Sequence, residues 1–144
     1  MTTAPTPRDD HIERAIALAG DARKRSYNPY SGFDMGAAVV DANGAEIGGV
    51  LIENVSLGLA MCAERVALFT AVANDVKPYI LSLSSKRTAG ALTFPCGACC
   101  QVALEIAGPD LLVVAVDTDG VHDQAFLRDL VPRAPHRFTH DPDS

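Results

Sequence analysis

Segments typical of strands and segments typical of helices alternate along this chain, and this alternation predicts a layered α/β domain. Residues 35–53 contain two strand-like runs joined at Asn43-Gly44, a dipeptide that favours an antiparallel hairpin. Two more strands are predicted in YILSLSS (79–85) and LLVVAVDT (111–118), with a predicted helix between them. A strand, helix, strand unit requires a crossover, so we expect a mixed sheet with the hairpin at one side and parallel strands beside it.

The helices are predicted from the spacing of apolar side chains and from their end signals. Between Asp10 and Arg25, isoleucine and alanine recur at the spacing of one helix face, and Asp10 and Glu13 are placed as in a capping box. A later helix is stopped by Gly108-Pro109. This later helix covers 96–107. Two further helices are predicted over 62–73 and, as a short final segment, over 123–131.

The composition is that of an ordinary globular chain, with 144 residues of which 48% are hydrophobic and 21% charged. We expect one domain over 1–144, with flexible tails at 1–9 and about 136–144. The net charge of -6 argues against a nucleic acid polymer as partner, because such binding needs a clustered basic face. No apolar run approaches the roughly 18 residues of a membrane helix, and no signal peptide pattern is visible. We therefore expect a cytoplasmic protein with no membrane partner.

All four cysteines lie between Cys62 and Cys100, and in a reducing compartment such a cluster favours metal binding or catalysis over disulfides. Cys62 and Cys96 each stand at the predicted start of a helix, where unpaired N–H groups and the helix dipole stabilise a thiolate. Cys99 follows Cys96 by three residues, so both sulfurs lie on one side of the first turn. With Cys62 they make three thiolates, and a catalytic zinc site has three protein ligands and leaves the fourth position to water.

A glutamate stands two residues after Cys62, inside an otherwise apolar helical run. We expect this residue, Glu64, to take a proton from zinc-activated water and pass it on. Three thiolates leave a zinc site formally negative, so positive charge should offset them. Arg65 adjoins Glu64, and we hypothesise that its guanidinium donates hydrogen bonds to the thiolates.

The motifs CAER (62–65) and PCGAC (95–99), preceded by NPYSGFDMGAA (28–38) and IENVS (52–56), resemble those of the small zinc-dependent cytidine deaminases. A ligand-x-Glu motif followed by Pro-Cys-x-x-Cys is typical of zinc deaminases. The resemblance implies a three-layer α/β/α domain with a mixed five-stranded sheet. It also implies hydrolytic deamination of a free cytosine nucleoside to the uracil nucleoside and ammonia, in a homotetramer with active sites near subunit interfaces.

The resemblance further implies roles for individual residues. Glu64 would be the general acid and base, Phe33 would pack on the pyrimidine, and the backbone N–H of Ala63 would contact the base. Glu53 would bind a ribose hydroxyl. From the residues alone, Phe33 is equally a core side chain, and Glu53 is alternatively a solvated strand end. The implied zinc ligands are Cys62, Cys96 and Cys99.

Four positions depart from the family's pattern, and one of them is Leu57, which stands where an aromatic side chain is common. Leu51 stands where the family has an asparagine that contacts the sugar, so a modified nucleoside such as a blasticidin-type antibiotic is an alternative substrate. Cys100 replaces an arginine, and we expect it to pack rather than bind metal, because the next helical position points about 100° away from Cys99. Pro135 stands where a late phenylalanine is expected, and Phe138 is a candidate for that role.

Two alternatives lie outside the deaminase class. A structural zinc module would need a fourth protein ligand and no role for Glu64. A redox dithiol at Cys96 and Cys99 would react with thiol reagents whether or not a chelator is present, whereas a metal site protects its thiols.

Overall fold

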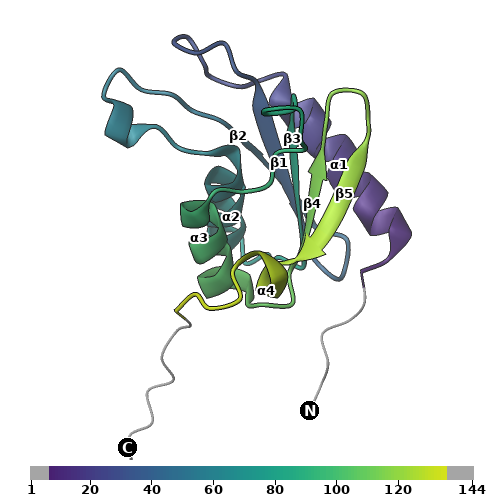
Figure 1. Ribbon diagram of the computed structural model, residues 1–144. Helices are drawn as coiled ribbons and strands as arrows, with labels where there is room; N and C mark the ends of the chain where they lie inside the picture. The colour runs from purple at the N-terminus through teal and green to yellow at the C-terminus, as the bar shows by residue number, and fades with distance from the viewer. Residues whose placement is uncertain (1–6, 136–144) are drawn as a thin grey trace, which may run out of the picture.

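The computed structural model describes residues 7–135 and shows one five-stranded sheet with helices on both faces (Figure 1). In chain order the elements are α1 (Asp9–Arg23), β1 (Met35–Val40), β2 (Glu46–Val50), the 3-10 helix η1 (Leu57–Leu59), α2 (Ala63–Ala73), β3 (Ile80–Ser85), α3 (Gly97–Ala107), β4 (Leu112–Val116), β5 (His122–Phe126) and α4 (Leu127–Leu130).

The strands lie in the order β2-β1-β3-β4-β5. The hairpin of β1 and β2 is antiparallel, with Val40 opposite Glu46, and β3 and β4 are parallel, with Ile80 opposite Leu112. β1 and β3, like β4 and β5, pair antiparallel. The expected mixed sheet, with the hairpin at one side and parallel strands beside it, is confirmed, and so are the five strands and three layers that the family resemblance implied (Figure 1).

The two faces of the sheet are buried against different helices. α1 covers one face, and α2 and α3 cover the other (Figure 1). Side chains of β3 alternate between the two cores, since Ile80 joins the cluster that contains Ala15 of α1 whereas Leu81 joins the cluster that contains Leu68 of α2. Both faces of this central strand are therefore buried, which explains why its residues are apolar or small at every position.

Two glycines allow the helices to lie directly on the hairpin. A Cβ on Gly49 of β2 would lie 2.5 Å from the carbonyl oxygen of Ala63 and from the amide nitrogen of Ala67 in α2. A Cβ on Gly36 of β1 would lie 2.3 Å from the carbonyl oxygen of Ala19 in α1. Only a residue without a side chain fits at either position.

Two local predictions are wrong. The capping box does not form, because α1 begins after Arg8 and the carboxylate of Asp10 pairs with the Arg8 guanidinium at 2.7 Å instead of capping the helix. The segment 123–131 is not one helix, because its first half pairs with β4 as β5 and only the last residues form α4. Pairing along the sheet edge satisfies backbone groups that a short helix would leave open.

Topology brings three loops to one edge of the sheet. Met35 at the start of β1 lies opposite Ser85 at the end of β3, and Gly36 lies opposite Val50 at the end of β2. The loops that lead into α2 and α3 therefore leave the sheet at the same edge, beside the loop that enters β1. Of the expected tails, residues 1–6 and 136–144, with Phe138, lie outside the described residues, and Asp9 already belongs to α1. Within residues 7–135, no helix has the length and apolar character to cross a membrane.

Candidate active site

The site is built on two helix N-termini at this edge. Cys62 is the N-cap residue of α2 and Cys96 is the N-cap residue of α3, as the sequence predicted to within one residue. Cys62 arrives there because the chain after β2 folds back on itself, with hydrogen bonds in both directions between the backbones of Ile52 and Met61. Cys96 arrives at the end of the loop from β3. The free N–H groups and the positive ends of both helices therefore face the thiols.

The sulfur atoms of Cys62, Cys96 and Cys99 all lie within 4.8 Å of one another. The sulfurs of Cys96 and Cys99 are 3.5 Å apart. A tetrahedral ion with metal–sulfur bonds of about 2.3 Å holds its sulfur ligands roughly 3.8 Å apart, so this arrangement fits zinc. Within residues 7–135 the cluster has three members and no fourth ligand, which leaves one coordination position for water or substrate.

The charge of the thiols is tuned by their contacts with one another and with Arg65. In the metal-free chain the pKa of Cys62 is lowered to about 5, first by the hydrogen bond with Cys99 and then by Arg65, against the effect of burial. Nη2 of Arg65 donates a hydrogen bond to the sulfur of Cys62 at 3.5 Å. The same hydrogen bond with Cys62, together with burial, raises the pKa of Cys99. One thiolate is thus stable before a metal ion binds, and metal binding would displace the protons of the other thiols.

Glu64 lies in the first turn of α2 and is only 2% exposed. Its Oε2 is buried with no hydrogen-bond partner among residues 7–135. Burial raises the pKa of Glu64 to about 7 in the metal-free chain, and the nearby Cys62 thiolate adds to the shift. A buried carboxyl oxygen without a partner is costly to the fold, and an incoming ligand would satisfy it.

Cys100 packs in the core and is absent from the sulfur cluster. It is 3% exposed and its thiol donates to the carbonyl oxygen of Pro95 at 3.5 Å. Burial raises its pKa, so the thiol stays protonated and inert. This is the packing role that the sequence predicted.

Glu53 is partly exposed, but its carboxylate is not isolated. Its Oε1 accepts hydrogen bonds from the backbone N–H groups of Tyr30 and Ser31, both at 3.1 Å. Hydrogen bonds from Ser31 and Tyr30 lower the pKa of Glu53, and the one from the Ser31 side chain has the largest effect. The carboxylate therefore holds the turn that leads to Phe33, while Oε2 takes part in neither hydrogen bond. Phe33 itself is half-buried at this edge of the sheet.

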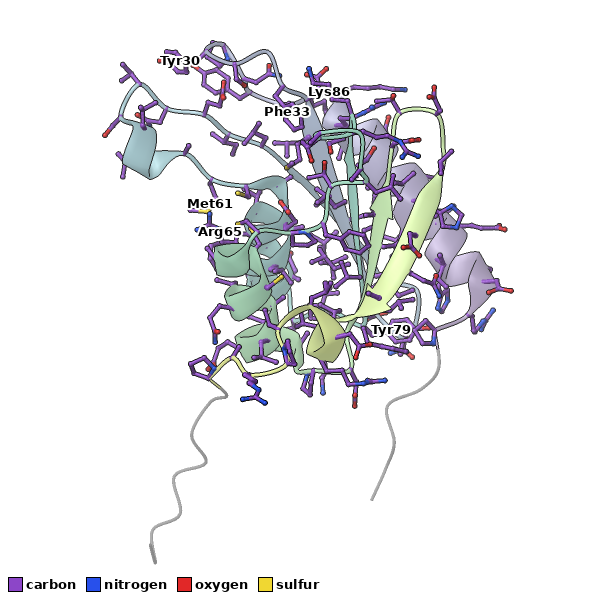
Figure 2. All side chains as sticks on the ribbon, in the orientation of Figure 1. Tyr30, Phe33, Met61, Arg65, Tyr79 and Lys86 are labelled. Atoms are coloured by element: carbon purple, nitrogen blue, oxygen red, sulfur yellow. The ribbon has the colours of Figure 1, made fainter. Side chains whose placement is uncertain are left out.

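Ala63 begins α2 and is fully buried, and as the first helical residue its N–H has no partner within the helix. Sequence reasoning missed the neighbour of Phe33: Nζ of Lys86, the first residue after β3, lies 5.4 Å from the Phe33 ring centroid (Figure 2). It also missed the need for Gly49, whose only sequence signal is a glycine pair inside a strand. Leu51 follows β2 directly and is half-buried.

Three thiols with an open fourth coordination position, beside a buried carboxyl group on a mixed α/β sheet, define this protein as a zinc-dependent hydrolase. It belongs to the family described as the cytidine and deoxycytidylate deaminase zinc-binding region, whose model matches residues 9–115.

Curated relatives and solved structures agree with this assignment. A cytidine deaminase of Halalkalibacterium halodurans is 39% identical over 122 residues, which is 83% of this chain and 89% of the relative. A cytidine deaminase of Sporosarcina psychrophila is 34% identical over 85% of this chain and 90% of the relative. A crystal structure of cytidine deaminase from Burkholderia pseudomallei superimposes with a TM-score of 0.78 at 39% identity, covering 85% of this chain and 97% of that one.

Proposed function

We propose that this protein catalyses the hydrolytic deamination of a free cytosine nucleoside, cytidine or deoxycytidine, to the uracil nucleoside and ammonia. One observation carries the proposal: the buried carboxyl group of Glu64, whose Oε2 has no hydrogen-bond partner among residues 7–135, lies beside three thiols that leave one metal coordination position open. The relatives named as cytidine deaminases support the choice of cytosine nucleosides.

Cys62, Cys96 and Cys99 would hold the zinc ion, which when bound supplies a Lewis acid that lowers the pKa of water. Glu64 would accept the proton that the attacking water loses and deliver it to N3 of the ring. It would then take the remaining proton from the new C4 hydroxyl and give it to the amino group at C4, which leaves as ammonia while the C4–O bond becomes the carbonyl of uracil. Burial of Glu64 excludes bulk water, so the proton passes between the carboxyl group and the substrate.

The substrate would be positioned by groups from three loops at the same sheet edge. The ring of Phe33 would pack on the pyrimidine, and the free N–H of Ala63 at the start of α2 would donate to the base. Oε2 of Glu53 would accept from a sugar hydroxyl, while Oε1 holds the turn next to Phe33. The substrate site would thus be rigid before the nucleoside arrives.

The decisive experiment is Glu64→Gln. We expect this variant to fold and bind one zinc ion per chain while turnover of cytidine falls by about 10²- to 10⁴-fold, because the general acid and base is gone. E105Q, which changes an exposed glutamate of α3, is the matched control and should keep full activity. Unchanged turnover in E64Q would refute the deaminase assignment of Glu64.

The identity of the sugar is a separate question, because Leu51 offers apolar surface where the family's asparagine contacts it. We expect cytidine and deoxycytidine to be deaminated. An assay by ultraviolet absorbance of both nucleosides beside a blasticidin-type antibiotic tests this. Turnover of the antibiotic alone would assign the protein to modified nucleosides.

The same zinc site separates the remaining alternatives. Thiols of a metal site should resist a thiol reagent until a chelator is added, whereas a redox pair at Cys96 and Cys99 would react in either case. A structural zinc module would hold its ion with a filled coordination sphere, which metal spectroscopy would detect.

We also propose a homotetramer in the cytoplasm, with a role in pyrimidine salvage. The four cysteines are free thiols, and the zinc ligands among them must stay reduced to bind metal. The segment around η1 exposes apolar side chains, with Val55 78%, Leu57 82% and Leu59 67% exposed, and a neighbouring subunit would cover them. Light scattering on the purified protein tests the tetramer, and a monomeric mass would refute it.

A further inference from the structure

A lysine lies against the aromatic ring that we assign to the substrate site. Nζ of Lys86 is 5.4 Å from the centroid of the Phe33 ring, within the range in which an ammonium group is attracted to an aromatic face. Figure 2 shows both side chains at the same end of the molecule, with Tyr79 at the opposite end. The pairing of Met35 with Ser85 explains the contact, because it sets the residues before β1 beside the residue after β3.

The backbone that carries Lys86 is tied down on both sides. Its carbonyl oxygen accepts hydrogen bonds from the hydroxyl groups of Ser85 and Thr93, at 3.0 and 3.3 Å. The next residue, Arg87, forms an ion pair with the buried carboxylate of Asp117 at 2.8 Å. The backbone of Lys86 is therefore held in place, and only its flexible side chain is free to move.

We propose that Lys86 is a positioning residue of the substrate site, whose ammonium group holds the Phe33 ring in the orientation that receives the pyrimidine. This inference rests on the proposed function, since it takes Phe33 as a substrate contact. Phe33 is only half-buried, so packing alone does not fix the orientation of its ring. The cation on one side removes that freedom before the substrate arrives.

The charge of Lys86 acts through the ring and not on the substrate. A cytosine nucleoside is uncharged at neutral pH, so an ammonium group gains no direct ionic attraction to it. A ring held in place improves binding of substrate and transition state equally, so its loss raises KM and leaves kcat unchanged.

The test compares K86M, which keeps a stem of similar length without the charge, with K86R, which restores a cation over the ring. We expect K86M to raise the KM for cytidine about two- to fivefold with kcat unchanged, the range that corresponds to ~0.5–1 kcal/mol for an exposed cation–π contact. K86R should restore the wild-type KM. The Kd for the product uridine, measured by calorimetry, should rise with KM in K86M. K77M removes an exposed lysine before β3, at the opposite sheet edge, and should change neither constant.

A second background shows whether the effect passes through Phe33. In an F33L protein the K86M substitution should cause no further rise in KM, because the ring is absent. An unchanged KM in K86M, a fall in kcat, or the same KM increase in the F33L background would each overturn the proposal. If the wild-type protein turns over no cytosine nucleoside, the proposed function fails and this inference fails with it. Failure of K86M alone leaves the proposed function intact.

Discussion

Nη2 of Arg65 lies 3.5 Å from the sulfur of Cys62, one helical turn further along α2. The spacing of three residues brings the two side chains to the same side of the helix, so the cation and the thiolate meet without help from other elements. A three-thiolate zinc site carries excess negative charge, and we propose that Arg65 offsets it.

Removal of that guanidinium should weaken metal binding. We expect R65L to lower zinc affinity by about 10- to 100-fold, as is typical when a partner of a metal ligand is removed. Competition with a chromogenic chelator measures the affinity. R25Q is the control, because Arg25 pairs with Asp21 on the exposed surface of the chain near α1 and should leave zinc affinity unchanged. Equal affinities in R65L and the wild type would show that the hydrogen bond does not stabilise the site.

Glu64 should make the metal-free protein less stable as the pH rises. Its pKa is raised from 4.5 to about 7, mainly by burial, so the folded state binds the proton more tightly than the unfolded chain. The stability from this proton is fully present below pH 4.5 and is lost as the pH rises through about 7. The shift corresponds to a loss on the order of 3 kcal/mol.

Comparison with E64Q isolates this effect from the titration of the thiols. In the presence of chelator, the free energy of unfolding of E64Q should rise relative to that of the wild type between pH 5 and pH 8, as measured by urea titration. E105Q, at an exposed position on α3, should follow the wild type at both pH values. A constant difference between E64Q and the wild type would contradict the buried neutral carboxyl group.

Gly49 should tolerate no side chain. G49A would push a methyl group against the backbone of Ala63 and Ala67, which cannot move without displacing the start of α2. We expect a loss of at least about 2 kcal/mol in the free energy of unfolding, measured by denaturant titration, together with weaker zinc binding because Cys62 is the N-cap of this helix. G58A, where nothing lies within 4 Å of the added carbon, should be close to neutral. Equal losses in the two variants would mean that the close approach does not set the cost.

Ser82 should destabilise the fold. Its side chain is fully buried in β3 and its Oγ has no hydrogen-bond partner among residues 7–135. S82A should therefore raise the free energy of unfolding by about 1 kcal/mol, measured by thermal or urea denaturation. S85A should lower it by about 1 kcal/mol, because the Ser85 hydroxyl donates to the carbonyl of Lys86 at 3.0 Å. A loss of stability in S82A would show that an unseen partner, such as a buried water molecule, satisfies the hydroxyl.

Local sequence patterns predicted the elements that carry the chemistry. The starts of α2 and α3 fell within one residue of their observed positions, because a cysteine before an apolar helical run is a local signal. The hairpin at Asn43-Gly44 was confirmed because a turn glycine is also a local signal. Gly44 adopts a positive φ of 89°, which glycine accepts without strain. The prediction for 123–131 failed because β5 forms only where β4 offers a partner strand.

The sequence by itself predicted the three cysteines that gather into one cluster, since ligand type and helical spacing are properties of short segments. Only the tertiary structure decided how the site is completed. The contact of Lys86 with Phe33, the anchoring of the Tyr30 turn by Glu53 and the close approach at Gly49 each join segments that are far apart in the chain. Such contacts depend on sheet register and helix packing, which bring distant residues within a few ångströms and leave no local pattern in the sequence.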